Sequence, residues 1–384
     1  MNKKAIAILG AIFLLIVGTL GFLVYSKYSG KDNPAPAPAF PEQPAPPPPP
    51  DDNATTTPGN PSSNNSGAFI KLTDDQVLSP ALFYNGNGIS YFDKSGKLFQ
   101  ADFDTSGSQL QLTRKRQLEI AAKPNIARIL WPSSGDNFIA EFNSFGKKTW
   151  SFYDNQKGVY SDLPEQVAYL DWMPSGNKIL YVWLANGKAS LNIADPDTKN
   201  YQHISDMWET DNAIDISPDG LNILFYETES TAVANKIKLT TPDGKLWRDL
   251  VKDGYNYGVL WSPDSQKFLF SKKERNSQKY QLWYYDLLTG EVKNLGLFST
   301  VDKAVWAGDS KTVYAAVPTS GSAGEGALTI DSFYKIDTAT LEKKEYQAYA
   351  SDLDGRDLFL NSAGDKLFFR NAQDGGLYYL DLNQ

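Results

Sequence analysis

The chain has 384 residues, of which 41% are hydrophobic, 13% aromatic and only 21% charged, a composition that favours a β-rich protein over a helical one. The net charge of −8 argues against a general nucleic-acid binder, because such proteins carry a basic footprint. The chain has no cysteine and a single histidine, His203, which excludes disulfides, thiolate metal sites and multi-histidine zinc sites.

The first segment predicts a membrane anchor. Lys3 and Lys4 precede an uncharged run from Ala5 to Tyr25. A helix of about 21 residues is about 30 Å long, which matches the hydrocarbon core of a bilayer. We therefore expect a cytoplasmic tip at 1–4, a signal-anchor helix at 5–25, and the rest of the chain outside, in the periplasm or at the cell surface. A cleaved signal peptide is the alternative, but it would have a shorter apolar run.

Residues 26–67 have the composition of a disordered spacer. Alternating Pro and Ala residues from Pro34 lead to five consecutive prolines, Pro46 to Pro50, and a Thr/Ser/Asn-rich stretch follows. Proline fixes φ and removes backbone donors, so this segment is expected to be extended polyproline II rather than packed structure. It would hold the following domain, residues 68–384, away from the membrane; a proline-rich ligand for another module is the alternative.

The remaining chain contains an internal repeat. Each copy starts with an apolar residue, most often tryptophan, followed by a Pro/Ser/Asp/Gly turn and a short apolar run, as in Trp261-Ser262-Pro263-Asp264. These short β-branched and aromatic runs, bounded by turn residues, predict strands. A repeat of 40–45 residues with four such strands is typical of a propeller blade. The copies begin at Trp131, Trp172, Ile216, Trp261, Trp306 and Leu360, at spacings of 41, 44, 45, 45 and 54 residues.

The repeat resembles the WD40-like repeat of TolB-type propellers. The resemblance lies in the Trp-Ser-Pro-Asp turn and in strands that end as Tyr284 to Gly290 do, in Tyr-Tyr-Asp-Leu-x-Thr-Gly. It covers residues 68–384 and implies an all-β, seven-bladed β-propeller, with six blades as the alternative. It says little about function, because such repeats occur in binding proteins and in enzymes. In a propeller the turn Pro and Asp and the packed Trp have structural roles.

The count of seven includes a first blade before Trp131, with strands near Leu82, Ile89, Leu98 and Gln109. The last copy supplies only three strands before the chain ends. We expect the segment Phe69–Thr73 to be the missing outer strand of the last blade, because this pairing closes the ring and removes an open sheet edge.

Candidate binding residues are basic and belong to one predicted face, which carries the loops between second and third strands and the links between blades. Arg114 to Arg116 are assigned to the link between the first and second blades, and Lys147 and Lys148 to a loop of the second. A basic sector on an acidic protein can steer an anionic partner; scattered solvated charge is the alternative. The proposed ligand-binding residues are Arg114, Lys115, Arg116, Lys147, Lys148, Lys272, Lys273 and Arg275.

No catalytic motif stands out. There is no nucleophile elbow, Walker loop or zinc-protease motif, and His203 lies in a strand-like run. No catalytic residue, metal ligand or cofactor is assigned. The sequence favours a binding module for an envelope protein, peptide or polysaccharide, with no nucleic-acid partner. The alternative is a membrane-tethered hydrolase or lyase acting on glycans; acidic side chains crowding the central channel, with shifted pKa values, would favour it.

Overall fold

The computed structural model describes residues 69–383 except 84–85, 108, 134–136, 145–146, 175–176, 208–211, 229–233, 275–276, 278, 322–326 and 347–351. The predicted cytoplasmic tip, anchor helix and linker lie outside the described residues. Within the described residues, no helix is both long enough and apolar enough to cross a membrane.

The described elements are antiparallel β-strands and one short 3-10 helix, η1 (Val301–Lys303). Sheet I contains β2 (Leu78–Leu82), β3 (Gly88–Phe92), β4 (Leu98–Asp104) and β5 (Gln111–Gln117). Sheet II contains β6 (Ile126–Leu130), β7 (Phe138–Ser144), β8 (Lys147–Asp154) and β9 (Val159–Asp162). Sheet III contains β10 (Val167–Trp172), β11 (Ile179–Ala185), β12 (Lys188–Ala194) and β13 (Gln202–Met207). Sheets IV and V contain β14 (Ala213–Ile216), β15 (Ile223–Tyr226), β16 (Asn235–Thr240), β17 (Trp247–Trp261), β18 (Lys267–Lys273), β19 (Tyr280–Asp286) and β20 (Val292–Asn294). Sheet VI contains β21 (Ala304–Trp306), β22 (Thr312–Ser320), β23 (Ile330–Asp337) and β24 (Lys343–Tyr346). Sheet VII contains β25 (Gly355–Leu360), β26 (Lys366–Asn371), β27 (Leu377–Asp381) and β1 (Phe69–Thr73).

The long strand β17 belongs to two sheets. Its first half pairs with β16 and completes sheet IV, and its second half pairs with β18 and begins sheet V. Counted in this way, the described strands form seven four-stranded units. Six have consecutive strands in the order of an antiparallel meander, and β1 completes the last one.

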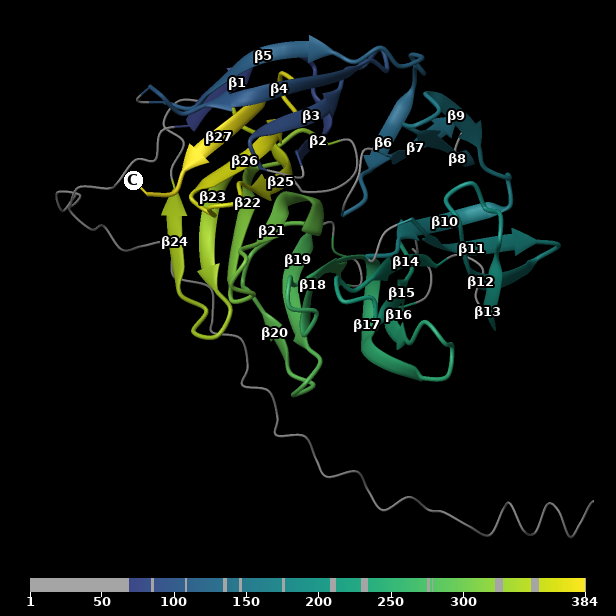
Figure 1. Cartoon of the computed structure of the whole chain (residues 1–384). Helices are drawn as coiled ribbons and strands as arrows, with labels where there is room; N and C mark the ends of the chain where they lie inside the picture. The colour runs from purple at the N-terminus through teal and green to yellow at the C-terminus, as the bar shows by residue number, and fades with distance from the viewer. Residues whose placement is uncertain are drawn as a thin grey trace, which may run out of the picture. The chain divides into compact units, whose positions relative to one another are not determined.

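The sheets follow one another around a ring, with their first strands innermost. β2 contacts both β6 and β25, β10 contacts β14, and β21 contacts β25. Figure 1 shows the last sheet, in yellow, beside the first, in dark blue. The outer strand of the last sheet is β1, which pairs with β27 from Phe69 opposite Leu380. The predicted closure of the ring by residues Phe69–Thr73 is therefore confirmed.

The repeated tryptophans join neighbouring sheets. The indole N–H of Trp172 donates to the Leu130 carbonyl of the preceding first strand (2.9 Å), and Trp306 donates to Leu260 (3.1 Å). A buried indole N–H needs an acceptor, and the preceding sheet supplies it. This explains why the repeat retains tryptophan.

The turn residues make further contacts between neighbouring sheets. The Ser265 hydroxyl accepts the Asp219 N–H (2.9 Å), and the Ser310 hydroxyl accepts the Asp264 N–H (3.0 Å), each bond running from one sheet to the next. The Asp264 carboxylate also accepts the Ser262 hydroxyl of its own turn (2.6 Å). The structural roles expected for the repeat residues are confirmed.

A buried ionic network connects sheets VI and VII. The Lys303 ammonium donates to Asp354 (2.5 Å), Asp331 (2.6 Å), the Thr329 hydroxyl (3.0 Å) and the Gly355 carbonyl (3.3 Å). The Lys303 side chain is 1% exposed and both carboxylates are 0% exposed. Burial of a charge is costly unless it is paired and hydrogen-bonded, and here the partners are complete.

Arg356 is the second cation of this network. It donates to Asp354 through Nε (3.1 Å) and to the Ala327 carbonyl (2.6 Å). Burial acts to raise the pKa of Asp354, but the bonds from Arg356 and Lys303 outweigh it, and the pKa is lowered. Burial raises the pKa of Asp331. The two cations balance the two carboxylates, so we assign the network a structural role in holding sheets VI and VII together.

Candidate functional site

The structure places the predicted basic residues mostly in strands. Arg114 to Arg116 lie in β5, the outer strand of sheet I, so their assignment to a link is wrong. Lys147 and Lys148 begin β8 rather than lying in a loop, and Lys272 and Lys273 end β18. A solvated outer strand has the polar composition of a link, which is why the sequence alone did not separate the two. Arg275 lies outside the described residues.

Each described member of this set has a polar or aromatic neighbour. Lys115 pairs with Asp75, and Lys147 pairs with Glu165 (2.5 Å). Lys272 lies 4.9 Å from the centre of the Trp283 ring and pairs with Glu274. The remaining contacts are Arg114 with Asp102, Arg116 with Gln100, Lys148 with the Tyr169 ring and Lys273 with the Tyr280 ring.

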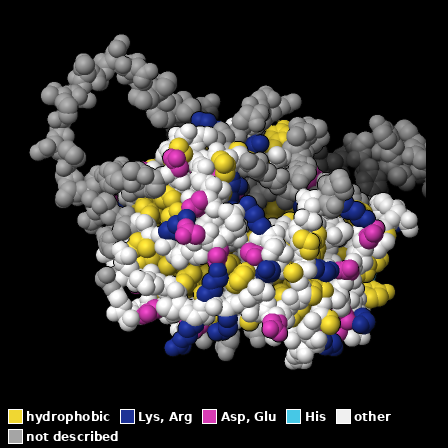
Figure 2. All heavy atoms as spheres, turned by 90° about the horizontal axis from the view of Figure 1, so that it is seen from above, with side chains coloured by type: hydrophobic (Ala, Val, Ile, Leu, Met, Phe, Trp, Pro, Cys, Tyr) yellow, Lys and Arg dark blue, Asp and Glu magenta, His cyan; other side chains and the backbone are white. Residues whose placement is uncertain are grey.

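The face of the molecule in Figure 2 has no separate basic surface. Figure 2 shows Lys and Arg side chains interspersed with Asp and Glu side chains there. Compensated surface charges contribute little long-range field. A role of this set in binding an anionic partner stays a prediction.

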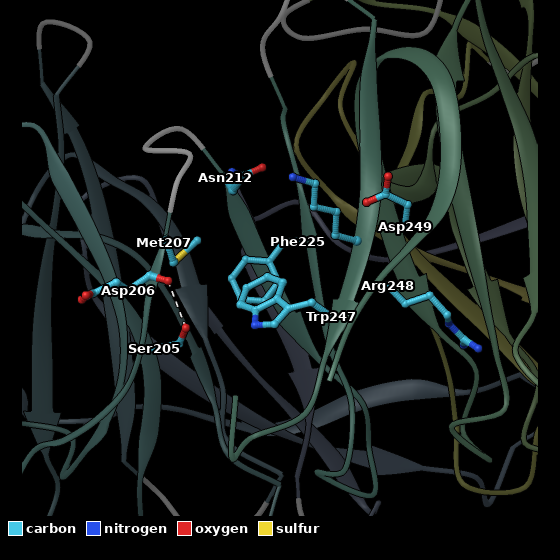
Figure 3. A pocket seen from close by; sticks show the side chains of 9 residues that line it. Ser205, Asp206, Met207, Asn212, Phe225, Trp247, Arg248 and Asp249 are labelled. Carbon is cyan, nitrogen blue, oxygen red and sulfur yellow. Dashed lines mark hydrogen bonds between the residues drawn. The ribbon is translucent and has the colours of Figure 1, made fainter. Parts of the chain in front are cut away.

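A groove with an exposed tryptophan lies between sheets III and IV. Trp247 starts β17 and is 43% exposed, and its ring centre lies 5.2 Å from that of Phe225 on β15, which is 1% exposed. Figure 3 shows the two rings side by side, with Met207 of β13 on the facing sheet. The groove has a volume of about 410 Å³ and is lined by Ser205, Asp206, Met207, Asn212, Phe225, Lys238, Trp247, Arg248 and Asp249. We call it the III–IV groove.

The local fold explains why Trp247 is exposed. Phe225 belongs to the apolar cluster that fills the interface of sheets III and IV, together with Leu191 and Ile214. Trp247 lies against Phe225 from β17, the outer strand of sheet IV. Packed sheets diverge toward the rim of a ring, so a side chain on an outer strand is covered less closely than one on an inner strand.

The charged side chains that line the groove have a net charge close to zero. Asp249 pairs with Lys236 (2.6 Å), and this bond lowers the pKa of the carboxyl group. Asn212 is buried, with 4% of its surface exposed. Asp206 and Arg248 point away from the two rings (Figure 3). An aromatic floor with a few polar side chains at its rim is the usual chemistry of a binding site for a polar organic group.

A second pocket, of about 530 Å³, lies between sheets VII and I. Its aromatic lining is already packed: Phe368 is 0% exposed, Tyr379 is 1% exposed, and the Phe103 ring stacks on Phe368 at 5.3 Å. This pocket therefore offers turn backbone and polar side chains, Asp365, Lys366 and Asp381 among them, rather than an open aromatic surface. The III–IV groove is the better candidate.

Two carboxylates occupy the innermost strands of sheets III and IV. Asp171 lies on β10 and Asp215 on β14. The Asp171 carboxylate accepts the Trp172 N–H of its own strand (2.8 Å) and the Ile216 N–H of the next sheet (3.0 Å). Both side chains are partly buried. We call Asp171 and Asp215 the carboxylate pair.

The pKa values of this pair are raised. Burial raises the pKa of Asp171 to about 6, against the opposing effect of its two N–H donors and of Arg128. Burial and then the charge of Asp171 raise the pKa of Asp215 well above its ordinary range, and Arg128 again opposes the shift. The two groups interact, so they titrate as a pair. Within the described residues, no group of three or more His, Asp or Glu side chains is placed to hold a metal ion.

Both features were missed at the sequence level, although the sequence contains a signal for each. Trp247 is a tryptophan outside the repeat position. Asp171 and Asp215 stand directly before the repeat position, where other copies have Leu130 and Leu260. A departure from a repeat is informative only once the copies are aligned residue by residue.

Comparisons with solved structures agree on the architecture. An oligogalacturonate lyase from Vibrio parahaemolyticus matches with 10% identity and a TM-score of 0.56, covering 82% of this chain and 97% of that one. The β-propeller domain of Cps50 (Swd1) from Myceliophteria thermophila matches with 10% identity and a TM-score of 0.55, covering 81% of this chain and 99% of that one. The described part of this chain is a β-propeller.

The fold implied by the WD40-like repeat is thus confirmed. TolB from Acinetobacter baumannii also matches, with 16% identity and a TM-score of 0.43, covering 80% of this chain and 79% of that one. The fold rests on the first two matches, since identities this low show fold alone. No family model matches the chain, and no curated protein matches it by sequence.

Proposed function

We propose that this protein is a β-propeller binding module, held outside the cell membrane by its N-terminal anchor and proline-rich linker. The observation that carries the proposal is the III–IV groove, in which Trp247 is 43% exposed above the buried Phe225. Exposed aromatic side chains beside polar groups are enriched at binding sites, because they offer a large contact area at little cost in conformational entropy. The partner is an envelope protein, a peptide or a polysaccharide.

A binding experiment with a matched control tests the groove. The full-length protein, solubilised in detergent, captures partners from envelope extract, and the affinity for the captured partner is then measured with Trp247→Ala and Phe298→Ala. Phe298 is also an exposed aromatic residue, at 49%, but it lies outside the groove. We expect Trp247→Ala to weaken binding about 30-fold, the loss typical of a central aromatic contact, and Phe298→Ala to have no effect. Equal affinities for the two variants would remove the groove from the proposal.

The proposed location has its own test, which uses the absence of cysteine. Leu288 lies in the turn before β20 and is 84% exposed, so Leu288→Cys creates a single accessible thiol. We expect a membrane-impermeant maleimide to label this variant in intact cells. Labelling only after lysis would place the propeller in the cytoplasm.

A second candidate function is a glycan hydrolase or lyase that depends on the carboxylate pair. Asp171 and Asp215 are acidic side chains on innermost strands with raised pKa values, the feature that favours an enzyme. One structurally similar protein is named as an oligogalacturonate lyase, which supports testing acidic glycans first. The measurement is release of new chain ends from acidic and neutral polysaccharides. Activity that disappears in Asp171→Asn would support this function, and no release from any substrate would leave the binding module as the proposal.

A further inference from the structure

The carboxylate pair occupies a position that is apolar in four other sheets. In four other repeats the residue before the tryptophan position packs into the apolar interface with the following sheet. The residues at this position are Leu130, Leu260, Val305 and Phe359, and each contacts a buried apolar cluster. Sheets III and IV have Asp171 and Asp215 instead. A carboxylate in place of an apolar side chain costs desolvation energy, so these two positions are not optimised for stability.

The contacts of the two carboxylates differ. Asp171 accepts two backbone N–H groups and so bridges sheets III and IV through Ile216. For the Asp215 carboxylate, the structure shows no hydrogen bond to any described residue. Its backbone pairs with Leu224 of β15, and its carbonyl also accepts the Trp261 indole N–H (3.3 Å). One member of the pair is thus fixed as an acceptor, and the other is available to carry a proton.

The charges around the pair do not neutralise it. Arg128 on β6 acts on both carboxylates, but its guanidinium already binds Glu141 of β7 through Nε (3.0 Å) and Nη2 (2.8 Å). Tyr226 of β15 and Tyr169 of β10 are the nearby phenols; burial, then Asp215, raises the pKa of Tyr226, which keeps it neutral. Lys148 of β8 lies over the Tyr169 ring at 5.4 Å. Two carboxylates that share one partly compensated cation do not both ionise readily.

We propose that Asp171 and Asp215 form a proton-binding pair in the inner wall of the ring, which stabilises the packing of sheet IV against its neighbours while it holds a proton and weakens this packing when both carboxylates are charged. The inference does not depend on either proposed function. A domain outside the membrane, as proposed above, meets the pH of its surroundings directly, so the packing of sheet IV would respond to acidification.

The sign of the effect follows from the pKa shifts. The pKa of Asp171 is about 6 in the folded protein against 3.8 ordinarily, and that of Asp215 is also raised. Between about pH 4 and pH 6 the folded state therefore holds a proton that the unfolded chain has released. The stabilisation is fully present below the unfolded pKa and is lost as the pH rises through the folded values.

Thermal unfolding of the full-length protein between pH 4 and pH 9 tests the inference. Asp215→Asn keeps the shape of the side chain and removes the second charge, and Asp206→Asn, whose side chain is 93% exposed on β13, is the control. We expect the Tm of the wild type and of the control to fall by about 4 °C relative to Asp215→Asn across this range. At pH 4 the three proteins should unfold at similar temperatures.

Parallel curves for all three proteins would overturn the inference, and so would a lower Tm of Asp215→Asn at pH 8. A direct measurement on the wild type guards against a variant that does not fold. Difference infrared spectra between pH 5 and pH 8 should contain the carbonyl band of a protonated carboxyl group, and Asp171→Asn should change its titration. Absence of this band at pH 5 would also overturn the inference.

Discussion

Lys303 offers the sharpest test of how the propeller is held together. Its ammonium neutralises Asp331 and Asp354, whose side chains are 0% exposed. Lys303→Met keeps most of the apolar stem and removes the charge and four hydrogen bonds. Two buried carboxylates then share only Arg356, which bonds Asp354. Breaking a buried pair by removing one partner costs about 3–5 kcal/mol.

The corresponding change in melting temperature can be estimated from the size of the domain. Unfolding entropy is about 2 cal/mol/K per residue, so a domain of roughly 300 residues loses about 1.5 °C for each kcal/mol. We therefore expect Lys303→Met to lower the Tm by about 5–8 °C at pH 7. The assay is calorimetric unfolding of full-length protein, with Lys188→Met as the control because Lys188 is exposed at the start of β12.

A triple variant separates the lost charge balance from lost packing. Lys303→Met combined with Asp331→Asn and Asp354→Asn removes the uncompensated carboxylates, and we expect it to recover at least half of the lost stability. The reasoning is refuted if Lys303→Met melts within about 1 °C of the Lys188→Met control, or if the triple variant is less stable than Lys303→Met.

Two further outcomes are expected from the contacts between sheets. Trp172→Phe should lower the free energy of unfolding by about 1–2 kcal/mol in urea denaturation, because the Leu130 carbonyl loses its indole donor while the aromatic packing is mostly kept; an unchanged midpoint would show that the bond contributes nothing. Deleting the chain through Thr73 removes β1 and should destabilise the propeller by about 4 kcal/mol or more and promote association, because the apolar contacts of Phe69 are lost and β27 becomes an open edge. A monomer of undiminished stability, seen by light scattering and urea titration, would contradict the role of β1 in ring closure.

The sequence by itself determined the repeating part of the fold. Trp, Pro and Asp recur because every sheet must make the same turn and the same contact with its neighbour, so the spacing of Trp261 and Trp306 already indicates the four-stranded unit. Ring closure by Phe69–Thr73 was also predictable, since the last copy lacks an outer strand and only one unassigned strand-like segment remains. Local turn chemistry and strand periodicity are properties of neighbouring residues, and such properties can be read in chain order.

The tertiary structure decided what the non-repeating residues do. Arg114 to Arg116 read as a link, but backbone pairing with β4 makes them part of an outer strand. Trp247 lies in a groove because β13 and β17 are the outer strands of neighbouring sheets, and Asp171 meets Ile216 because two first strands lie side by side. Burial and pKa depend on residues brought together from separate sheets, about 44 positions apart in the chain for this repeat. No local pattern contains that information, so the groove and the carboxylate pair emerged only from the folded ring.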